Sequence, residues 1–289
     1  PWGRAVDPNR LEDALKRNPE ASIVAFVQAE TSTGASSDTQ QLAALAHRYE
    51  CLTIVDAVTA LAGSPLEVDG WDVDAVYAGS QKCLSCTPGL APISLNQRAV
   101  DKIKARRTPV QSWFMDLNLV LGYWGGDDSS SRRSYHHTAP VNALYGLHEA
   151  LVMLAEEGVE QSWSRHRRHH LALRAGLEAL GLELVVPEPE RLPQLNAVSI
   201  PGGIDDVAVR RQLLERFNME IGAGLGDFAG KTWRIGLMGF SSRAENVLLC
   251  LSALGTVLNE LGHAADTGQA LSKATQAMGR LAELSTARC

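Results

Sequence analysis

Residues 73–82 read VDAVYAGSQK, and this stretch decides the fold because an apolar run passes directly into a polar turn that ends on a lysine. The run from Val73 to Ala78 is short, rich in valine and alanine, and followed by glycine, which is typical of a buried strand. Lys82 therefore lies just past the end of a predicted strand. Most lysines in such turns are solvated and inert, so the groups that the fold brings to Lys82 decide whether it does chemistry.

Apolar strands alternate with amphipathic helices through the first half of the chain. The pattern predicts strands over 22–27, 52–56, 73–78 and 92–95, and helices over 8–17, 38–49 and 97–106. This alternation predicts an α/β fold with a mostly parallel sheet that helices cover on both faces. Ligands gather at the carboxyl ends of such strands, and Thr31, Asp56 and Lys82 all lie at or just after these ends.

A second unit is predicted in the second half of the chain, after a long helix over 141–157. A helix over 158–180 leads into strand-like runs over 182–186, 197–200 and 232–237, with helices over 205–217 and 243–261. We read this βαβ-like pattern as a smaller C-terminal α/β domain over 158–262, followed by a loosely ordered tail over 263–289. The large domain over 1–157 opens like the end of a strand, so we expect it to be incomplete at its N-terminus.

Composition excludes several classes of protein. The chain has 289 residues, of which 45% are hydrophobic and 21% charged, enough for two domains with buried cores. Its net charge of −6 does not favour nucleic acid or an anionic membrane as a partner. No apolar run approaches the length of a membrane span. We therefore expect a protein that binds neither nucleic acid nor membrane.

The cysteines indicate a cytoplasmic location. They are odd in number and lack the spacing of a disulfide framework, as in a reducing compartment. They are Cys51, Cys83, Cys86, Cys250 and Cys289. The pair Cys83 and Cys86 has no second ligand pair at zinc spacing and follows a lysine turn, so we interpret it as incidental and expect no metal.

Asp56 and Lys82 together predict pyridoxal 5'-phosphate (PLP). A lysine can hold an aldehyde cofactor as a Schiff base, and a carboxylate can keep a pyridine nitrogen protonated. Asp56 alone could equally be a helix N-cap. Arg234 lies in a buried strand pattern and needs an anion, which is either a substrate carboxylate or a structural salt bridge.

The segment YHHTAP at 135–140 places phenol, imidazole and hydroxyl groups just before a predicted helix. The N-terminus of a helix with a free hydroxyl nearby is a natural phosphate site. Adjacent histidines point in different directions and make a poor metal pair.

Five motifs together resemble those of a known family. They are AETSTG at 29–34, VDAV at 55–58, GSQK at 79–82, YHHTAP at 135–140 and WRIGLMG at 233–239. In this order they resemble the alanine–glyoxylate and serine–glyoxylate aminotransferases, in the class V group of fold-type I PLP enzymes. The resemblance covers residues 1–261 and implies the fold-type I PLP-transferase fold.

The resemblance also implies roles for single residues. Lys82 would carry the Schiff base and Asp56 would pair with the pyridine nitrogen. Thr31 would hydrogen-bond the phenolic oxygen of PLP, and Gln81 would contact its phosphate. Members of the family carry a longer N-terminal part, with a phosphate-binding turn and a stacking aromatic residue that this chain lacks.

The remaining roles concern the second subunit and the substrate. Tyr135 and Thr138 would reach the phosphate of the neighbouring subunit's cofactor in a homodimer, and Arg234 would hold the substrate carboxylate. The resemblance implies ping-pong transfer of an amino group from alanine or serine to glyoxylate or pyruvate, with small amino acids and 2-oxo acids as substrates.

Two alternatives stay open. A cysteine desulfurase or lyase on the same fold needs a mobile nucleophilic cysteine late in the chain, whereas Cys250 lies in an apolar helical pattern and Cys289 lies in the tail. The other alternative is a truncated, catalytically silent chain.

Overall fold

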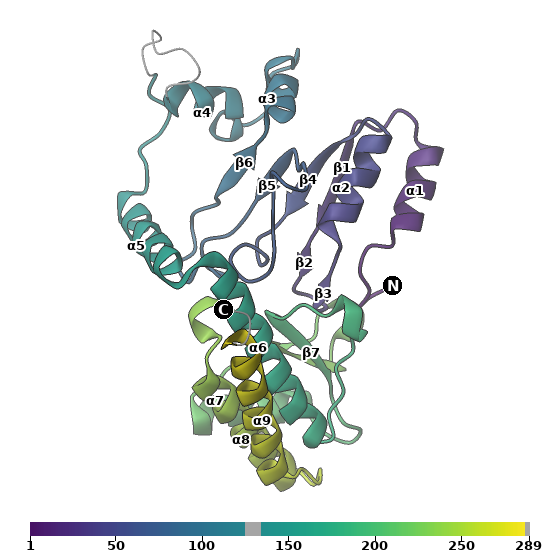
Figure 1. Ribbon diagram of the computed structural model, residues 1–289, viewed down its shortest axis with the longest axis vertical. Coiled ribbons are helices and arrows are strands. Elements are labelled where there is room, and N and C mark those ends of the chain that lie inside the picture. The colour runs from purple at the N-terminus through teal and green to yellow at the C-terminus, as the bar shows by residue number, and fades with distance from the viewer. Residues whose placement is uncertain (125–133, 287–289) are drawn as a thin grey trace.

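The structure is a computed structural model that describes residues 1–124 and 134–286. Figure 1 shows an upper lobe around β1, β4, β5 and β6 and a lower lobe of helices around β7. Helix α6 (Val159–Ala179) runs from the junction of the lobes through the lower one, and α9 (Thr267–Thr286) packs along it. Among the described residues, no helix is long and apolar enough to cross a membrane.

The upper lobe contains a four-stranded sheet in the order β1-β4-β5-β6. Its strands are β1 (Ile23–Val27), β4 (Leu52–Asp56), β5 (Ala75–Tyr77) and β6 (Ile93–Leu95). The first three are parallel, and β6 is antiparallel to β5. Val27 pairs with Asp56, which pairs with Tyr77, so these strands end level with one another. The predicted mostly parallel sheet is confirmed.

Helix caps fix where the upper helices begin. The Asp7 side chain accepts a hydrogen bond from the Asn9 amide at the start of α1 (Pro8–Arg17), and that of Asp38 accepts one from Gln41 at the start of α2 (Thr39–Arg48). Further elements complete the part of the chain before α6. They are β2 (Ala29–Glu30), β3 (Ala35–Ser36), α3 (Gln97–Lys104), η1 (Trp113–Met115), α4 (Leu117–Trp124) and α5 (Val141–Glu157).

The two faces of this sheet differ. On one face, Val55 and Val76 are buried in a core with Ala43 of α2. On the other, Ile23, Tyr77 and Ile93 keep 46%, 38% and 41% of their surface exposed. A groove of about 250 Å³ lies over this second face, and α3 and the start of α4 line one side of it. The sequence predicted helices on both faces of the sheet. Among the described residues, helices bury one face, and the other face stays partly exposed.

The lower lobe has an antiparallel sheet rather than the βαβ-like arrangement expected from the sequence. Its order is β7-β9-β8, with β7 (Leu195–Ser199) and β8 (Gly222–Ala223) both antiparallel to β9 (Thr232–Gly236). The strand-like run 182–186 contributes only a single bridge, from Leu184 to Val198. The other elements here are η2 (Glu188–Glu190), α7 (Asp206–Phe217), η3 (Gly226–Phe228), η4 (Gly239–Ser241) and α8 (Ala244–Glu260).

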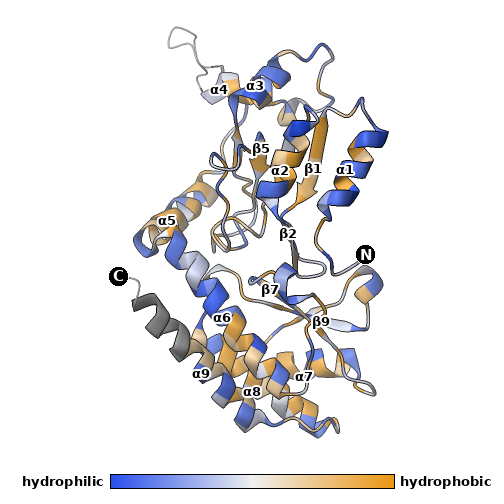
Figure 2. Cartoon of the chain, turned by 45° about the vertical axis from the view of Figure 1, so that its right-hand side comes forward, coloured by the Kyte–Doolittle hydropathy of each residue, from blue (hydrophilic) through white to orange (hydrophobic). Residues whose placement is uncertain are grey.

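The segment expected to be a loosely ordered tail forms helix α9. Ala270 and Ala274 of α9 are fully buried in the same core as Trp233. Small side chains explain the close approach, because a Cβ added at Gly255 of α8 would lie 2.4 Å from Oγ1 of Thr267. Figure 2 shows hydrophobic stretches of α8 and α9 within the lower lobe, with hydrophilic residues on its outside.

Gly158 separates α5 from α6 and has a φ of 86°, a conformation that side-chain-bearing residues rarely adopt. Figure 1 shows the chain change direction between α5 and α6. The predicted domain limits at 157 and 262 stay predictions.

Candidate active site

Asp56 is the last residue of β4, where its carboxylate is held from two sides. One oxygen accepts a hydrogen bond from the Val58 amide at 2.9 Å, and the other accepts one from the Tyr77 hydroxyl at 2.8 Å. Tyr77 is the residue of β5 that pairs with Asp56 across the sheet. The half-buried carboxylate still has lone pairs for a further donor, because a carboxylate can accept about four hydrogen bonds.

Lys82 lies in the turn that follows β5, beside the end of β4. Ser80 anchors the turn, because it is fully buried and its hydroxyl donates to the Thr87 carbonyl at 2.7 Å. Lys82 is half-buried, and its amine has no hydrogen-bond or ion-pair partner among the residues described in the structure. The backbone thus fixes the turn and leaves the amine available.

Gln81 and Gly79 bring the turn close to the residues after Asp56. A Cβ added at Gly79 would lie 2.8 Å from Oε1 of Gln81 and 3.2 Å from Cγ1 of Val58. Gln81 itself is exposed. Its amide therefore lies at the same edge as Lys82 and is open to solvent.

Arg234 comes from β9 of the lower lobe and reaches the upper lobe. Its Nη1 donates to the Thr31 carbonyl at 3.0 Å and its Nε donates to the Ala223 carbonyl at 2.7 Å. It makes no ion pair with any residue of 1–124 or 134–286, so the structural salt bridge considered from the sequence is absent there. Nη2 has no described acceptor. The guanidinium is oriented by two carbonyls and keeps its charge for an incoming anion.

Among the described residues, Tyr135 and Thr138 contact each other and make no contact with Lys82, Asp56 or Arg234. The Tyr135 hydroxyl and Thr138 Oγ1 are 2.7 Å apart, and Tyr135 is 73% exposed. No contact of either residue that the structure describes involves Lys82 or Asp56. They precede α5 as a polar pair on the surface.

The sequence did not single out Tyr77. The signal was available, because a strand of this sheet that ends level with Asp56 places its last residue opposite the carboxylate. The hydrogen bond to Asp56 and burial both raise the pKa of Tyr77 above its usual value of 10. Tyr77 therefore stays a neutral donor at physiological pH.

Burial makes two thiols unreactive, that of Cys83 in the Lys82 turn and that of Cys250 in α8. Burial raises the pKa of Cys83 to about 12 and that of Cys250 to about 12. Among the residues described, no group of three His, Cys, Asp or Glu side chains is placed to hold a metal ion.

Asp56 ends β4, Lys82 follows the adjacent parallel strand β5, and Arg234 of the lower lobe contacts the Thr31 carbonyl. With the similarity to solved aminotransferases reported below, this architecture is that of the fold-type I PLP-transferases. The family model for aminotransferase class-V matches residues 3–247. The chain belongs to the class-V aminotransferase family.

Curated relatives include enzymes that act on glyoxylate. The chain is 39% identical to the (S)-ureidoglycine–glyoxylate transaminase of Bacillus subtilis over 291 residues, which cover 94% of this chain and 68% of the relative. It is 41% identical to the alanine–glyoxylate aminotransferase of Callithrix jacchus over 249 residues, which cover 86% of this chain and 59% of the relative. The chain thus spans about three fifths to two thirds of these relatives.

Solved structures agree with this assignment. The alanine–glyoxylate aminotransferase from Nostoc sp. has a TM-score of 0.85 and 45% identity, covering 89% of this chain and 67% of that one. The ureidoglycine–glyoxylate aminotransferase from Bacillus subtilis has a TM-score of 0.90 and 41% identity, covering 96% of this chain and 70% of that one. A NifS-like protein at 19% identity shares the fold alone.

Proposed function

We propose that the chain is a PLP-dependent aminotransferase that moves an amino group from alanine or serine to glyoxylate or pyruvate. The observation that carries the proposal is that the unpartnered amine of Lys82 lies in the turn after β5, while the oriented carboxylate of Asp56 ends the adjacent parallel strand β4. The names of relatives 39% and 41% identical to the chain support glyoxylate as the amino acceptor.

The residues at this edge fit PLP. Asp56 has a free lone pair for a protonated ring nitrogen, and Lys82 has a free amine for the aldehyde carbon. Thr31 would donate to the phenolic oxygen, and the exposed amide of Gln81 would contact the phosphate. When bound, PLP supplies an electron sink for the bonds broken at the substrate α-carbon.

Lys82 would have two tasks in this proposal. It would hold the cofactor covalently in the absence of substrate. Once free, its amine would accept the proton from the substrate α-carbon and return it during the transfer. Tyr77 would hold the orientation of the Asp56 carboxylate.

Arg234 determines the class of substrate. Its two carbonyl contacts leave Nη2 for a carboxylate of the amino acid or the 2-oxo acid. The sequence offers no obvious second cationic anchor for a side-chain carboxylate. A single anchor favours small monocarboxylic substrates.

A homodimer would complete the site. Tyr135 and Thr138 would bind the phosphate of the partner's cofactor, as the family resemblance implies. The helix that follows them supports this arrangement, because Val141, Leu144 and Tyr145 of α5 are 52%, 42% and 73% exposed. Exposed apolar residues on one helix are typical of a surface that a second copy covers.

The decisive experiment locates the cofactor bond. The protein is loaded with PLP and reduced with borohydride, and mass spectrometry of its peptides identifies the modified residue. We expect the pyridoxyl group on Lys82, its loss together with the visible absorption band in Lys82→Ala, and no change in the control Lys16→Ala. A reducible adduct that persists in Lys82→Ala would overturn the assignment.

The amino donor follows from a panel assay with glyoxylate. Alanine, serine, ureidoglycine and cysteine are compared, with pyruvate formation as the readout for alanine and sulfide release as the readout for cysteine. We expect turnover with alanine or serine and no sulfide. Buried Cys250, whose pKa is raised to about 12, argues against a desulfurase. A lack of turnover with every donor at saturating PLP would favour a catalytically silent chain.

A further inference from the structure

Helix α6 makes hydrogen bonds to η4, which begins shortly after β9, the strand that carries Arg234. The amide of Gly239 donates to Nε2 of His166 at 2.9 Å, and its carbonyl accepts from Nη1 of Arg165 at 2.8 Å. The hydroxyl of Ser242 lies 3.1 Å from Nδ1 of His169. Both backbone groups of Gly239 are therefore satisfied by α6.

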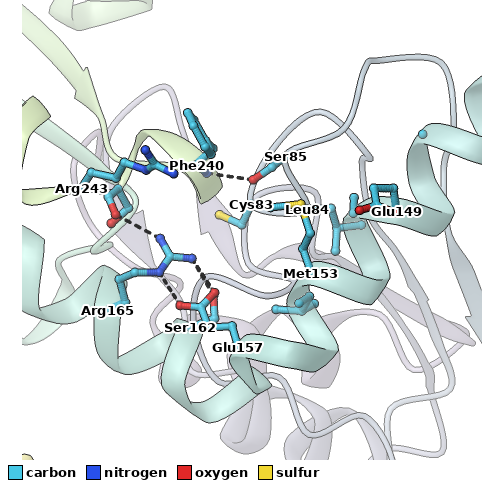
Figure 3. A pocket seen from close by; sticks show the side chains of 14 residues that line it. Cys83, Leu84, Ser85, Glu149, Met153, Glu157, Ser162, Arg165, Phe240 and Arg243 are labelled. Carbon is cyan, nitrogen blue, oxygen red and sulfur yellow. Dashed lines mark hydrogen bonds and ion pairs between the residues drawn. The ribbon is translucent and has the colours of Figure 1, made fainter.

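Gly239 also lies close to the backbone of the turn that carries Lys82. A Cβ added at Gly239 would lie 2.1 Å from Oγ of Ser85, 2.9 Å from the Cys83 carbonyl and 3.1 Å from the Lys82 carbonyl. The amide of Phe240 donates to Oγ of Ser85 at 2.8 Å, as Figure 3 shows. Only a glycine allows this approach, and η4 meets the Lys82 turn backbone to backbone.

The Lys82 turn needs such support. Ser85 has a φ of 61°, a left-handed conformation that costs about 1–2 kcal/mol in a residue with a side chain. A cavity of about 370 Å³ lies beside it, lined by Cys83, Leu84 and Ser85 together with residues of α5. Since packing is open on that side, the contacts with Gly239 and Phe240 restrain the turn.

His166 is built for this contact. It is fully buried; its Nε2 accepts the Gly239 proton, so Nδ1 carries the ring proton and donates to the Ser162 carbonyl at 2.7 Å. Burial lowers its pKa to about 4, against the opposing effect of the hydrogen bond to the Ser162 carbonyl, and nearby Arg165 acts in the same direction as burial. The ring is therefore neutral at physiological pH with both nitrogens used.

The segment 234–239 thus touches the upper lobe at both ends. Arg234 contacts the Thr31 carbonyl at one end, and Gly239 contacts the Lys82 turn at the other. We propose that His166 is a positioning residue of the active site that, through Gly239, fixes the Lys82 turn relative to Arg234. The inference rests on the proposed function for the roles of Lys82 and Arg234, whereas the contacts themselves do not depend on it.

The first test needs no cofactor. Cys83 is buried in the Lys82 turn, so its rate of alkylation by iodoacetamide, resolved by peptide mass spectrometry, reports opening of the turn. Cys51 and Cys250 are buried elsewhere and serve as references within the same molecule. We expect His166→Leu to raise the rate at Cys83 by about tenfold and to leave the rates at Cys51 and Cys250 unchanged, as loss of one hydrogen bond predicts.

Matched variants separate positioning from general destabilisation. His170 is the control, because it lies one turn further along α6, is also buried, and contacts Asn196 instead of Gly239. His170→Leu should leave Cys83 protected. His166→Gln keeps a donor and an acceptor and should restore most of the protection. Ser85→Ala removes the Phe240 contact from an exposed residue, so it should fold and expose Cys83 even if His166→Leu does not fold.

The second test uses the PLP-loaded enzyme. We expect kcat to fall about 10- to 100-fold in His166→Leu, since small displacements of reacting groups have effects of this size. The absorption band of lysine-bound cofactor should persist, and His166→Gln should recover kcat. Equal losses of kcat in His170→Leu, or a parallel rise at Cys51 and Cys83, would overturn the proposal. A wild-type protein without transaminase activity would refute the proposed function alone, whereas unchanged Cys83 reactivity in both His166→Leu and Ser85→Ala would refute the positioning role alone.

Discussion

The Tyr77 hydroxyl binds the Asp56 carboxylate across two adjacent strands, with 2.8 Å between the oxygens. The pair is set by strand register, because the two residues lie opposite each other at the ends of β5 and β4. A neutral phenol that donates to one oxygen restricts rotation of the carboxylate and leaves its charge intact.

Tyr77→Phe should lower kcat about tenfold, because a hydrogen bond to a charged group contributes about 1.5–3 kcal/mol. The substitution should also remove one late-ionising tyrosine from a spectroscopic pH titration. Tyr49→Phe is the matched control, since Tyr49 donates to Glu12 at 3.1 Å near α1 and α2. An unchanged kcat in Tyr77→Phe would show that Asp56 needs no such partner.

Arg234→Lys should raise KM for the amino donor and the 2-oxo acceptor alike by about 10- to 100-fold. Lysine keeps the charge but loses the planar guanidinium, which is oriented by the Thr31 and Ala223 carbonyls and presents Nη2 to a carboxylate. Steady-state kinetics with each substrate varied in turn measures the effect. Arg216→Lys on the surface, where Arg216 pairs with Glu260, is the control. A rise confined to one substrate would contradict a shared carboxylate anchor.

Asp74→Asn should lower the free energy of unfolding by about 3–5 kcal/mol, the usual effect of breaking a buried charged network. The Asp74 carboxylate is fully buried and binds Nε2 of His47 at 2.8 Å, the Thr53 amide at 2.8 Å and Nε of Arg98 at 2.7 Å. Asp72→Asn is the control, because Asp72 shares Arg98 but is 62% exposed. Urea unfolding at neutral pH measures both.

The same network predicts a pH dependence. Burial raises the pKa of Asp74, but hydrogen bonds hold this pKa far below its usual value; they come from His47, Thr53, Asn96 and Arg98. The same carboxyl in the unfolded chain titrates at about pH 3.9. The stability that ionised Asp74 gives the fold is therefore complete above that pH and is lost as the pH falls below it. Wild-type unfolding free energy should drop in this range, and Asp74→Asn should flatten the drop.

Gly239→Ala should destabilise the protein more than Gly230→Ala. Both glycines have positive φ, 55° and 70°, so the conformational penalty of about 1–2 kcal/mol is shared. A Cβ at Gly230 meets nothing within 4 Å, whereas one at Gly239 meets the backbone of the Lys82 turn. Urea unfolding of the two variants gives the difference, and equal effects would show that η4 can move away at no cost.

Ala274→Lys should lower the free energy of unfolding by about 3 kcal/mol or more, because it forces a charged side chain into a packed core. Ala274 of α9 is fully buried. Gln276→Lys, on the exposed side of the same helix, should be neutral. Similar stability of both variants would show that α9 is loosely ordered, as the sequence predicts.

Local signals made much of the fold predictable. Helices α1, α2 and α7 were expected within a residue of where they begin, because aspartates at 7, 38 and 205 cap them. Strand direction in the lower lobe was not predictable, since it depends on how connections cross the lobe. The run 182–186 has strand composition but pairs at one residue only.

The site divides in the same way. Asp56 and Lys82 could be named as candidates from the sequence because Asp56 ends one strand and Lys82 lies in the turn after the next. The contact between His166 and Gly239 joins residues 73 apart, and no local pattern distinguishes His166 from the other histidines of α6. Helix α9 was underestimated because alanines bury little area each, although they permit close packing.

Three positions on α6 contact two separate segments of the chain. Ser162 donates to the Ala62 carbonyl, His166 accepts from Gly239, and His169 lies against Ser242. The spacing between Ser162, His166 and His169 therefore matters to these contacts as well as the identity of each residue. One residue inserted after Ser162 would rotate the rest of the helix by about 100° and break the last two contacts together. Substitutions on the outer face of α6 leave all three intact.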